Sequence, residues 1–210
     1  MLENIQVLCH SSIKMVRNGK IIYFDPFKID RNRNDADYIF VTHSHYDHFS
    51  EEDILKVKKE NSVIVVTNDL IERTQDLGFD IDNIITVTPD KEYNISGIKF
   101  RTVRAYNENK DFHPKDNNWV GYILEFDGYK YYVAGDTDIT EDNKKVSCDV
   151  AFIPIGGTYT MDINEAANLI EYIKPKVVVP THYGTIVGEK DDGLKFKKIV
   201  NSNVECKILI

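Results

Sequence analysis

The sequence lacks any hydrophobic run that could cross a lipid bilayer. Its longest apolar runs, such as Val63–Val66 and Val150–Ile155, fall far short of the roughly 20 residues that a membrane-spanning helix needs. At the N-terminus, Glu3 and Gln6 stand where a signal peptide would carry basic residues and then a long apolar run. We therefore expect a protein that neither spans a membrane nor is secreted, and that works in the cytoplasm.

Cysteine is also scarce, and its pattern is uninformative for disulfide bonding. The chain has 3 cysteines, Cys9, Cys148 and Cys206, which are odd in number, widely spaced and without a Cys-x-x-Cys pair. This pattern suits a reducing compartment better than a disulfide framework. We expect all of them to be core or near-surface residues.

Basic residues are fewer than acidic residues. The chain carries 26 basic and 34 acidic residues, which gives a net charge of −8 with neutral histidines, and this argues against broad attraction to nucleic acid or to anionic membranes. Hydrophobic residues make up 42% and charged residues 29%, as in ordinary globular proteins. A length of 210 residues fits one compact domain, so we predict a single domain over residues 1–210.

Short β-type runs alternate with helical segments, which predicts an α/β fold. The expected strands are Ile5–Cys9, Ile13–Val16, Ile21–Phe24, Tyr38–Thr42, Val63–Thr67, Ile84–Val87, Ile98–Val103, Trp119–Phe126, Tyr129–Ala134, Val150–Ile153, Val177–Val179 and Val204–Leu209. The expected helices are Ser50 to about Glu60, Asp69 to Gly78, Asp162 to Ile173 and Asp192 to Val200. Asn18-Gly19 and Asp127-Gly128 predict tight hairpin turns.

Residues 43–48 carry the densest chemical signal. They place three histidines and one aspartate within six residues, immediately after a predicted buried strand. Imidazole and carboxylate groups are preferred ligands of zinc, iron and manganese. In a loop at the end of a strand, alternate side chains can point at one ion. The next two side chains can then point at a second ion. The alternatives are a solvated histidine turn and a structural site for a single ion.

The segment 43–48 resembles the His-x-His-x-Asp-His motif of the metallo-β-lactamase superfamily. Residues 134–137 look like the Gly-Asp-Thr aspartate that follows a strand in this superfamily, and residues 180–183 look like its last histidine. The segments occur in the family's order, and the resemblance covers nearly the whole chain. It implies a four-layer αβ/βα sandwich, with two mixed sheets face to face, helices outside and the metal ions at one sheet edge.

The resemblance also implies a set of metal ligands. His43 and His45 would bind a first ion, Asp47, His48 and His182 would bind a second ion, and Asp136 would bridge the two. The expected cofactor is one or two divalent ions per chain, with zinc favoured over manganese, iron or nickel. Taken alone, Asp136 could instead cap its turn, and His182 could be a core histidine.

One position departs from the family's pattern. The family has a further histidine ligand at the end of a strand between the first motif and the Gly-Asp-Thr segment, and Asn107 stands there. Asparagine is a poor zinc ligand, and His113 follows six residues later in a polar loop. His113 could reach the site as a ligand or as a proton carrier. Whether Asn107 or His113 completes the first metal site is left open at this point.

Other segments resemble one branch of the superfamily, the L-ascorbate-6-phosphate lactonase-like hydrolases. These are residues 9–12, residues 25–26 and residues 154–161. His10 is a candidate catalytic or substrate group, or else a packed polar core residue. Gly157, with Gly156, is expected in a tight turn whose amides could hold an oxyanion or phosphate, or which could be purely structural. Asn107 and Tyr159 are further candidate substrate contacts.

The implied activity is that of a metal-dependent hydrolase. A metal-bound hydroxide would attack an ester, lactone or phosphodiester bond of a small, anionic metabolite. Asp47 would orient or deprotonate the nucleophile, and His113, His10 or Tyr159 would protonate the leaving group. The alternatives are a metal-dependent nuclease or phosphodiesterase, which the charge disfavours, and a metal-binding protein with little turnover. The expected partner is a small-molecule substrate, and self-association is left open.

Metal content tests this hypothesis directly. We expect tag-free protein to carry one or two divalent ions per chain, and we expect His45→Ala to lose metal because it removes a first-motif ligand. The measurement is inductively coupled plasma mass spectrometry on both proteins. Equal metal content in the two proteins would contradict the assignment of the first motif as a metal site.

Overall fold

The computed structural model describes residues 1–210, which divide into two compact units. The N-terminal unit is Leu2–Thr88, and the C-terminal unit is Pro89–Ile210 together with Met1. The single domain over 1–210 stays a prediction. None of the helices has both the length and the apolar composition that a bilayer crossing requires.

The N-terminal unit contains one six-stranded sheet in the order β1-β2-β3-β4-β5-β6. Its strands are β1 (Ile5–Cys9), β2 (Ser12–Arg17), β3 (Lys20–Phe24), β4 (Ala36–Phe40), β5 (Lys58–Thr67) and β6 (Ile84–Val87). The helices are α1 (Glu51–Val57) and α2 (Ile71–Asp76), with short 3₁₀ turns η1 (Asn68–Leu70) and η2 (Ile81–Asn83). Strands β1 to β3 are antiparallel, whereas β3 to β6 are parallel.

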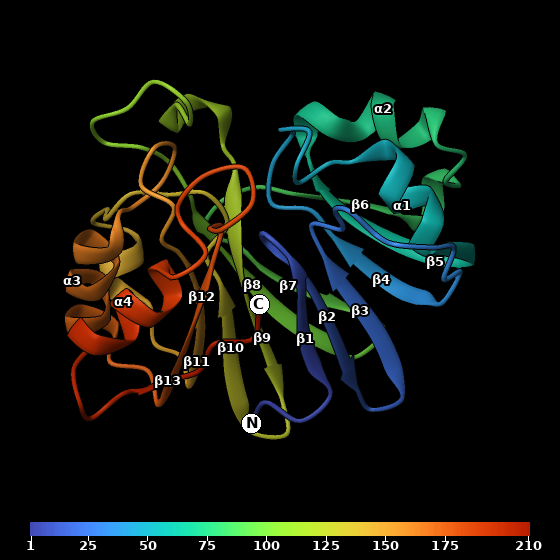
Figure 1. Cartoon of the computed structure of the whole chain (residues 1–210). Helices are drawn as coiled ribbons and strands as arrows, with labels where there is room; N and C mark the ends of the chain where they lie inside the picture. Colours follow the sequence, from blue (N-terminus) through green and yellow to red (C-terminus); the bar gives the residue numbers. More distant parts are fainter. The chain divides into compact units, whose positions relative to one another are not determined.

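The hydrophobic core of the N-terminal unit lies between its sheet and its helices. Ile54 and Val57 of α1 are buried in one cluster with Ile39 of β4 and Ile64 of β5, and α1 and α2 lie beside β4 to β6 in Figure 1. Ser50 begins α1 because its side chain accepts a hydrogen bond from the Asp53 N–H. This packing holds the segment between β4 and α1, which contains the first motif.

The C-terminal unit contains one seven-stranded sheet in the order β13-β12-β11-β10-β9-β8-β7. Its strands are β7 (Glu92–Ile95), β8 (Ile98–Arg104), β9 (Val120–Phe126), β10 (Tyr129–Val133), β11 (Val150–Pro154), β12 (Val177–Thr181) and β13 (Glu205–Cys206). The helices are α3 (Ile163–Ile173) and α4 (Asp192–Ile199), with 3₁₀ turns η3 (Lys115–Asn117) and η4 (Asn143–Lys145). Strands β7 to β10 are antiparallel, and β10 to β13 are parallel.

Helices α3 and α4 cover the parallel part of this sheet (Figure 1). Leu169 and Ile170 of α3 and Phe196 of α4 are completely buried in one cluster with Ile153 of β11 and Val178 of β12. Burying each such side chain contributes about 1.5–3 kcal/mol. The two mixed sheets with their helices confirm the predicted α/β fold class.

Strand direction collects the predicted site residues at one end of each sheet. In the N-terminal unit β1, β3 and β4 run the same way, and their ends lead into His10, Asp25 and Thr42. In the C-terminal unit β8, β10, β11 and β12 run the same way. Asn107, Asp136, Gly156 and His182 follow these four strands in that order.

Several predicted boundaries need correction. The helix predicted from Ser50 to about Glu60 ends at Val57, because Lys58 opens β5 and pairs with Ala36. The Ser62 hydroxyl, which accepts from the Lys59 N–H and donates to the Ala36 carbonyl, secures this irregular pairing. Strand β7 was not predicted, since it is a short edge strand whose side chains alternate between exposed and half-buried.

The last predicted strand, 204–209, is reduced to the two residues of β13. Both predicted hairpin turns are confirmed, with left-handed φ angles of 51° at Asn18, 73° at Gly19, 54° at Asp127 and 75° at Gly128. Such pairs of positive φ angles are what a tight two-residue hairpin turn requires.

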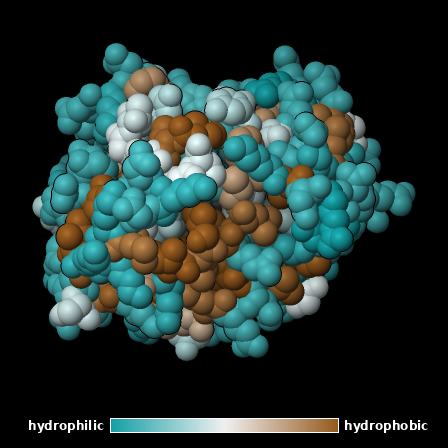
Figure 2. Space-filling model, viewed as in Figure 1, coloured by the Kyte–Doolittle hydropathy of each residue, from teal (hydrophilic) through white to brown (hydrophobic).

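The face seen in Figure 2 has hydrophobic residues gathered toward its middle and hydrophilic residues around them. The exposed large hydrophobic side chains are Met1, Tyr46, Leu55, Ile81, Phe112, Tyr172, Leu194, Ile199 and Ile210. Exposed hydrophobic side chains are common on folded proteins.

The N-terminus of α3 offers a test of local stability. The Asp162 carboxylate accepts from the Asn164 and Glu165 N–H groups, and the Glu165 carboxylate accepts from the Asp162 N–H. We expect Asp162→Ala to lower the free energy of unfolding by about 1 kcal/mol, whereas Asp162→Asn, which keeps an accepting oxygen, should cost only a few tenths. Urea unfolding measures both, and equal losses would contradict the capping role.

Candidate metal centre

The first motif forms a compact histidine cluster in the loop after β4. His43 and His48 are buried, with ring centroids 4.0 Å apart, and the His43 and His45 centroids are 4.7 Å apart. The loop closes on itself, because the His45 carbonyl accepts from the N–H groups of His48 and Phe49. The sequence pattern therefore places these imidazoles side by side, as the metal hypothesis requires.

Asp25, at the end of β3, organises this cluster from behind. It is completely buried, and its carboxylate accepts from the Thr42 N–H at 2.8 Å and from the Thr42 hydroxyl at 2.8 Å. His48 Nδ1 lies 2.7 Å from Asp25 Oδ2. Burial raises the pKa of the Asp25 carboxyl, while the His48 ring and the Thr42 donors oppose that rise.

These contacts decide which ring nitrogen would face a metal ion. If His48 donates its Nδ1–H to Asp25, its Nε2 carries the lone pair. The Thr42 hydroxyl, which donates to Asp25, can accept from His43 Nδ1 at 2.9 Å, and this leaves Nε2 as the ligand atom of His43 as well. Carboxylate or hydroxyl groups behind metal-binding histidines commonly fix the ring in this way.

The sequence reasoning had used Asp25 only as part of a family resemblance and had missed this contact. The sequence feature that could have indicated this contact is an acidic residue directly after a predicted strand, at the same sheet end as the histidines.

His10 and Asp47 form a second contact in the N-terminal unit. His10 Nε2 lies 3.2 Å from Asp47 Oδ2, and both side chains are buried. The ligand atoms of His10, Asp47 and His48 all lie within 4.8 Å of one another. The structure thus places His10 beside the first motif, at the end of β1, and its catalytic role stays a prediction.

Three residues of the candidate centre adopt left-handed backbone conformations. The φ angles are 55° at His10, 42° at Asp25 and 58° at His182. Such conformations are uncommon for residues with a side chain, and they cluster at functional sites where surrounding structure enforces them. Each of these residues directly follows a strand, at the end of its sheet where the other candidate residues of its unit lie.

The C-terminal unit contributes a second cluster around Asp136. His113 Nε2 lies 3.3 Å from Asp136 Oδ2, and His182 Nε2 lies 3.0 Å from the same oxygen. All three side chains are at least 97% buried. Two imidazole nitrogens therefore converge on one carboxylate oxygen, from three separate segments of the chain.

Asn107 does not point its amide at Asp136. Its Oδ1 accepts from the His113 N–H at 3.0 Å and lies 2.8 Å from His113 Nδ1, and its Nδ2 donates to the Tyr159 carbonyl at 3.0 Å. Asn107 and His113 are thus brought together, with the imidazole between the amide and Asp136. Tyr159 is half-buried and packs edge-on against the exposed Phe112, 4.7 Å between centroids.

The glycine turn after β11 lies against His182. A Cβ at Gly156 would come 2.3 Å from the His182 carbonyl oxygen, so only glycine fits there. The Gly157 N–H donates to the Met161 carbonyl, and the Thr158 N–H donates to the Gly156 carbonyl. These two amides bond within the loop, and contact between Gly157 and a substrate stays a prediction.

The basic side chains near His113 have partners inside the protein. Lys110 is paired with the buried Asp138 carboxylate, and the Arg104 guanidinium donates to Asn118 Oδ1 and to the Lys115 carbonyl. They stiffen the loop between β8 and β9, which carries His113.

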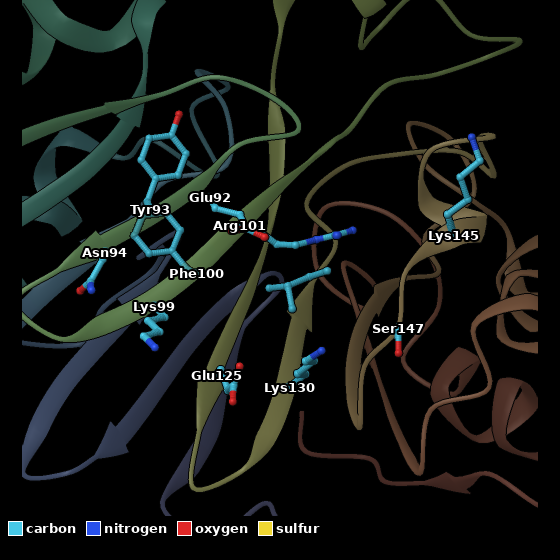
Figure 3. A pocket seen from close by; sticks show the side chains of 11 residues that line it. Glu92, Tyr93, Asn94, Lys99, Phe100, Arg101, Glu125, Lys130, Lys145 and Ser147 are labelled. Carbon is cyan, nitrogen blue, oxygen red and sulfur yellow. The ribbon is translucent and has the colours of Figure 1, made fainter.

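A cleft of about 530 Å³ lies elsewhere on the C-terminal unit. Strands β7 to β10 and the segment before β11 line it with charged groups, and Figure 3 shows Glu125 and Lys130 close together on neighbouring strands. None of the predicted site residues lines it, so we assign no catalysis to it.

Two of the cysteines, Cys148 and Cys206, offer no competing chemistry. No disulfide links them, and burial raises the pKa of the Cys148 thiol to about 12 and that of Cys206 to about 11. Both thiols therefore stay protonated at neutral pH, whereas the thiolate is the reactive and metal-binding form.

The donor sets of both units fit a divalent transition metal. Buried imidazole nitrogens and carboxylate oxygens are the ligands that zinc takes in catalytic sites, and histidines backed by a hydrogen-bonding partner bind it best. Two ligand atoms of one tetrahedral zinc ion lie about 3.3 Å apart, which matches the spacing of both histidines around Asp136. The identity of the metal stays a prediction.

Gly156 offers a test of the contact behind His182. Gly156→Ala would drive a Cβ into the His182 backbone, so we expect a loss of about 1–3 kcal/mol in unfolding free energy together with reduced metal content. Gly157→Ala is the matched control, because its Cβ would make only ordinary contacts and its cost, about 1–2 kcal/mol, comes from a φ of 83°. Urea unfolding and metal analysis measure both variants, and full metal content in Gly156→Ala would contradict the prediction.

The chain is similar in sequence to known metal-dependent hydrolases. Residues 4–182 match a family model described as "Beta-lactamase superfamily domain". A UPF0173 metal-dependent hydrolase of Thermococcus onnurineus is 31% identical, over 99% of this chain and 96% of the relative. Another, from Natranaerobius thermophilus, is 30% identical over 98% and 95%.

Solved structures of other proteins have a fold similar to that of this chain. A proposed metal-dependent hydrolase of Parabacteroides distasonis is 28% identical, with a TM-score of 0.82 over 98% of this chain and 91% of the other. Igni18, a metallo hydrolase of Ignicoccus hospitalis, shares the fold with 23% identity and a TM-score of 0.79 over 97% and 93%. The predicted resemblance to the superfamily is therefore confirmed, and this chain belongs to the UPF0173 family of metal-dependent hydrolases within the β-lactamase superfamily.

Proposed function

We propose that this protein uses one or two divalent ions, with zinc favoured, to hydrolyse an ester, lactone or phosphodiester bond in a small metabolite. The observation that carries the proposal is the convergence of His113 and His182 on Asp136 Oδ2. The family's motifs imply the ligands. These would be His43, His45, Asp47 and His48 of the first motif, and Asp136 and His182 of the C-terminal unit.

The residues of the chain take distinct roles in this proposal. A bound divalent ion lowers the pKa of water and stabilises negative charge on the attacked group. Asp47 orients the attacking water or accepts its proton, since a carboxylate within hydrogen-bond reach can do both. His10, 3.2 Å from Asp47, would either donate to that carboxylate or, with Nε2 unprotonated, take up the proton from it. Asp25 and Thr42 keep the ligand histidines in the correct tautomer.

We infer the class of substrate from a resemblance of three segments. The segments 9–12, 25–26 and 154–161 resemble the L-ascorbate-6-phosphate lactonase-like branch, which favours a small, anionic ester or lactone. Lys110 and Arg104 are held by internal partners, so affinity for an anion would come mainly from the metal ions. Tyr159, whose carbonyl accepts from Asn107, and the exposed Phe112 would contact the apolar part of a substrate.

A panel assay tests the function. Protein reloaded with Zn²⁺ or Mn²⁺ is offered aryl esters, lactones and bis-aryl phosphodiesters, with and without a chelator. We expect turnover of at least one class, and we expect chelation or His45→Ala to lower it more than about 100-fold, beyond the usual effect of an outer-shell change.

Arg101→Ala, in the cleft that contains no predicted site residue, is the control and should retain full turnover. Turnover that survives both chelation and His45→Ala would contradict a metal-dependent mechanism. Full metal binding with no turnover on any class would instead favour a metal-binding protein. Salt-dependent RNA binding with RNA cleavage would favour the nuclease alternative, against which the net charge of −8 stands.

A further inference from the structure

The C-terminal unit holds a pair of residues that departs from the family's ligand pattern. The family's strand-end histidine is replaced by Asn107, and His113 stands between that asparagine and Asp136. We propose that His113 has taken over the metal-ligand role of position 107, and that Asn107 now acts as the positioning residue of His113. This inference rests on the proposed metal-dependent function and assigns the ligand that the sequence left open.

Three hydrogen-bond contacts join the same two residues. The Asn107 N–H donates to the His113 carbonyl at 2.8 Å, and the His113 N–H donates to Asn107 Oδ1 at 3.0 Å. The same Oδ1 lies 2.8 Å from His113 Nδ1. Residues 107–113 thus form a closed loop in which the asparagine fixes both the backbone and the ring of the histidine.

The third contact sets the chemistry of the imidazole. An amide oxygen only accepts, so Nδ1 must carry the hydrogen and Nε2 must carry the lone pair. Nε2 is the atom that lies 3.3 Å from Asp136 Oδ2, the spacing of about 3.3 Å expected between two ligands of one tetrahedral ion. A group behind the imidazole that selects this tautomer is the usual companion of a metal-binding histidine.

The side chain at position 107 has to accept and donate at once. Its Nδ2 donates to the Tyr159 carbonyl at 3.0 Å, which ties the His113 loop to the glycine turn before α3. Aspartate could replace the accepting oxygen but not this donor. Trp119 packs edge-on against the His113 ring, 5.7 Å between centroids, and both side chains are buried. The imidazole is therefore held on three sides.

His182 is the second histidine that contacts Asp136. His113 and His182 contact the same oxygen of Asp136 at 3.3 and 3.0 Å. The family's pattern assigns His182 to the second ion and makes Asp136 the bridge. Because His182 already has a position in that pattern, His113 takes the ligand position that Asn107 leaves open.

The test exchanges the two roles. The variants are His113→Ala, Asn107→Ala, Asn107→Asp and the double variant Asn107→His/His113→Ala. Each is loaded with Co²⁺ or Zn²⁺, and the measurements are metal stoichiometry, metal affinity and the visible Co²⁺ spectrum, none of which needs a substrate. Far-UV circular dichroism confirms the fold of each variant, and His113→Gln replaces His113→Ala if the alanine variant does not fold.

We expect His113→Ala to lose one ion per chain or to bind it more than about 100-fold more weakly, with a changed Co²⁺ spectrum. Asn107→Ala should weaken binding about 10–100-fold, and Asn107→Asp, which keeps the accepting oxygen, should lose less. The double variant should regain metal, because position 107 is the family's own ligand position.

Wild-type stoichiometry, affinity and Co²⁺ spectrum in folded His113→Ala would overturn the ligand assignment. Unchanged affinity in Asn107→Ala would overturn its positioning role, and a double variant that regains no metal would overturn the exchange of roles. A failure of the proposed hydrolase activity is distinguishable, because it shows as absent turnover in wild-type protein whose metal binding still responds to these substitutions.

Discussion

The direction of parallel strands is the constraint on which the candidate centre depends. Each sheet changes from antiparallel to parallel pairing along its width, and strands that run the same way end at the same edge. Residues that lie far apart in the chain therefore meet within each unit. Asp136 and His182 are 46 positions apart in the sequence, yet their side chains are 3.0 Å apart because β10 and β12 end together.

Both units support their candidate ligands by the same physical device. In the N-terminal unit the buried Asp25 carboxylate stands behind His48, and in the C-terminal unit the Asn107 amide stands behind His113. Each partner accepts from Nδ1 and so presents Nε2. The carboxylate also receives two bonds from Thr42, whereas the amide uses its second end to hold the Tyr159 carbonyl. The partners differ in charge but fix the ring in the same way.

Local sequence predicted most elements because their signals are local. The Asn18-Gly19 and Asp127-Gly128 turns need positive φ angles that these residues tolerate, and α3 begins at an acidic capping residue. Prediction was wrong at the end of α1 because a distant partner intervened. Helix α1 ends before Lys58 because residues 58–62 bond to Ala36, which the local pattern does not show. Strand β7 was missed although it pairs with β8 across the two-residue turn Ser96-Gly97, because its side chains carry little hydrophobic signal.

The sequence by itself determined the superfamily, the α/β class and the candidate ligands, because a dense histidine motif and strand-end positions are recognisable without coordinates. It could place Asn107 and His113 near each other but could not divide the roles between them. Only the tertiary structure decided that Asn107 faces the His113 ring and that the ring faces Asp136. The reason is that side-chain direction in a long loop depends on partners from other strands, here Tyr159, Trp119 and Asp136.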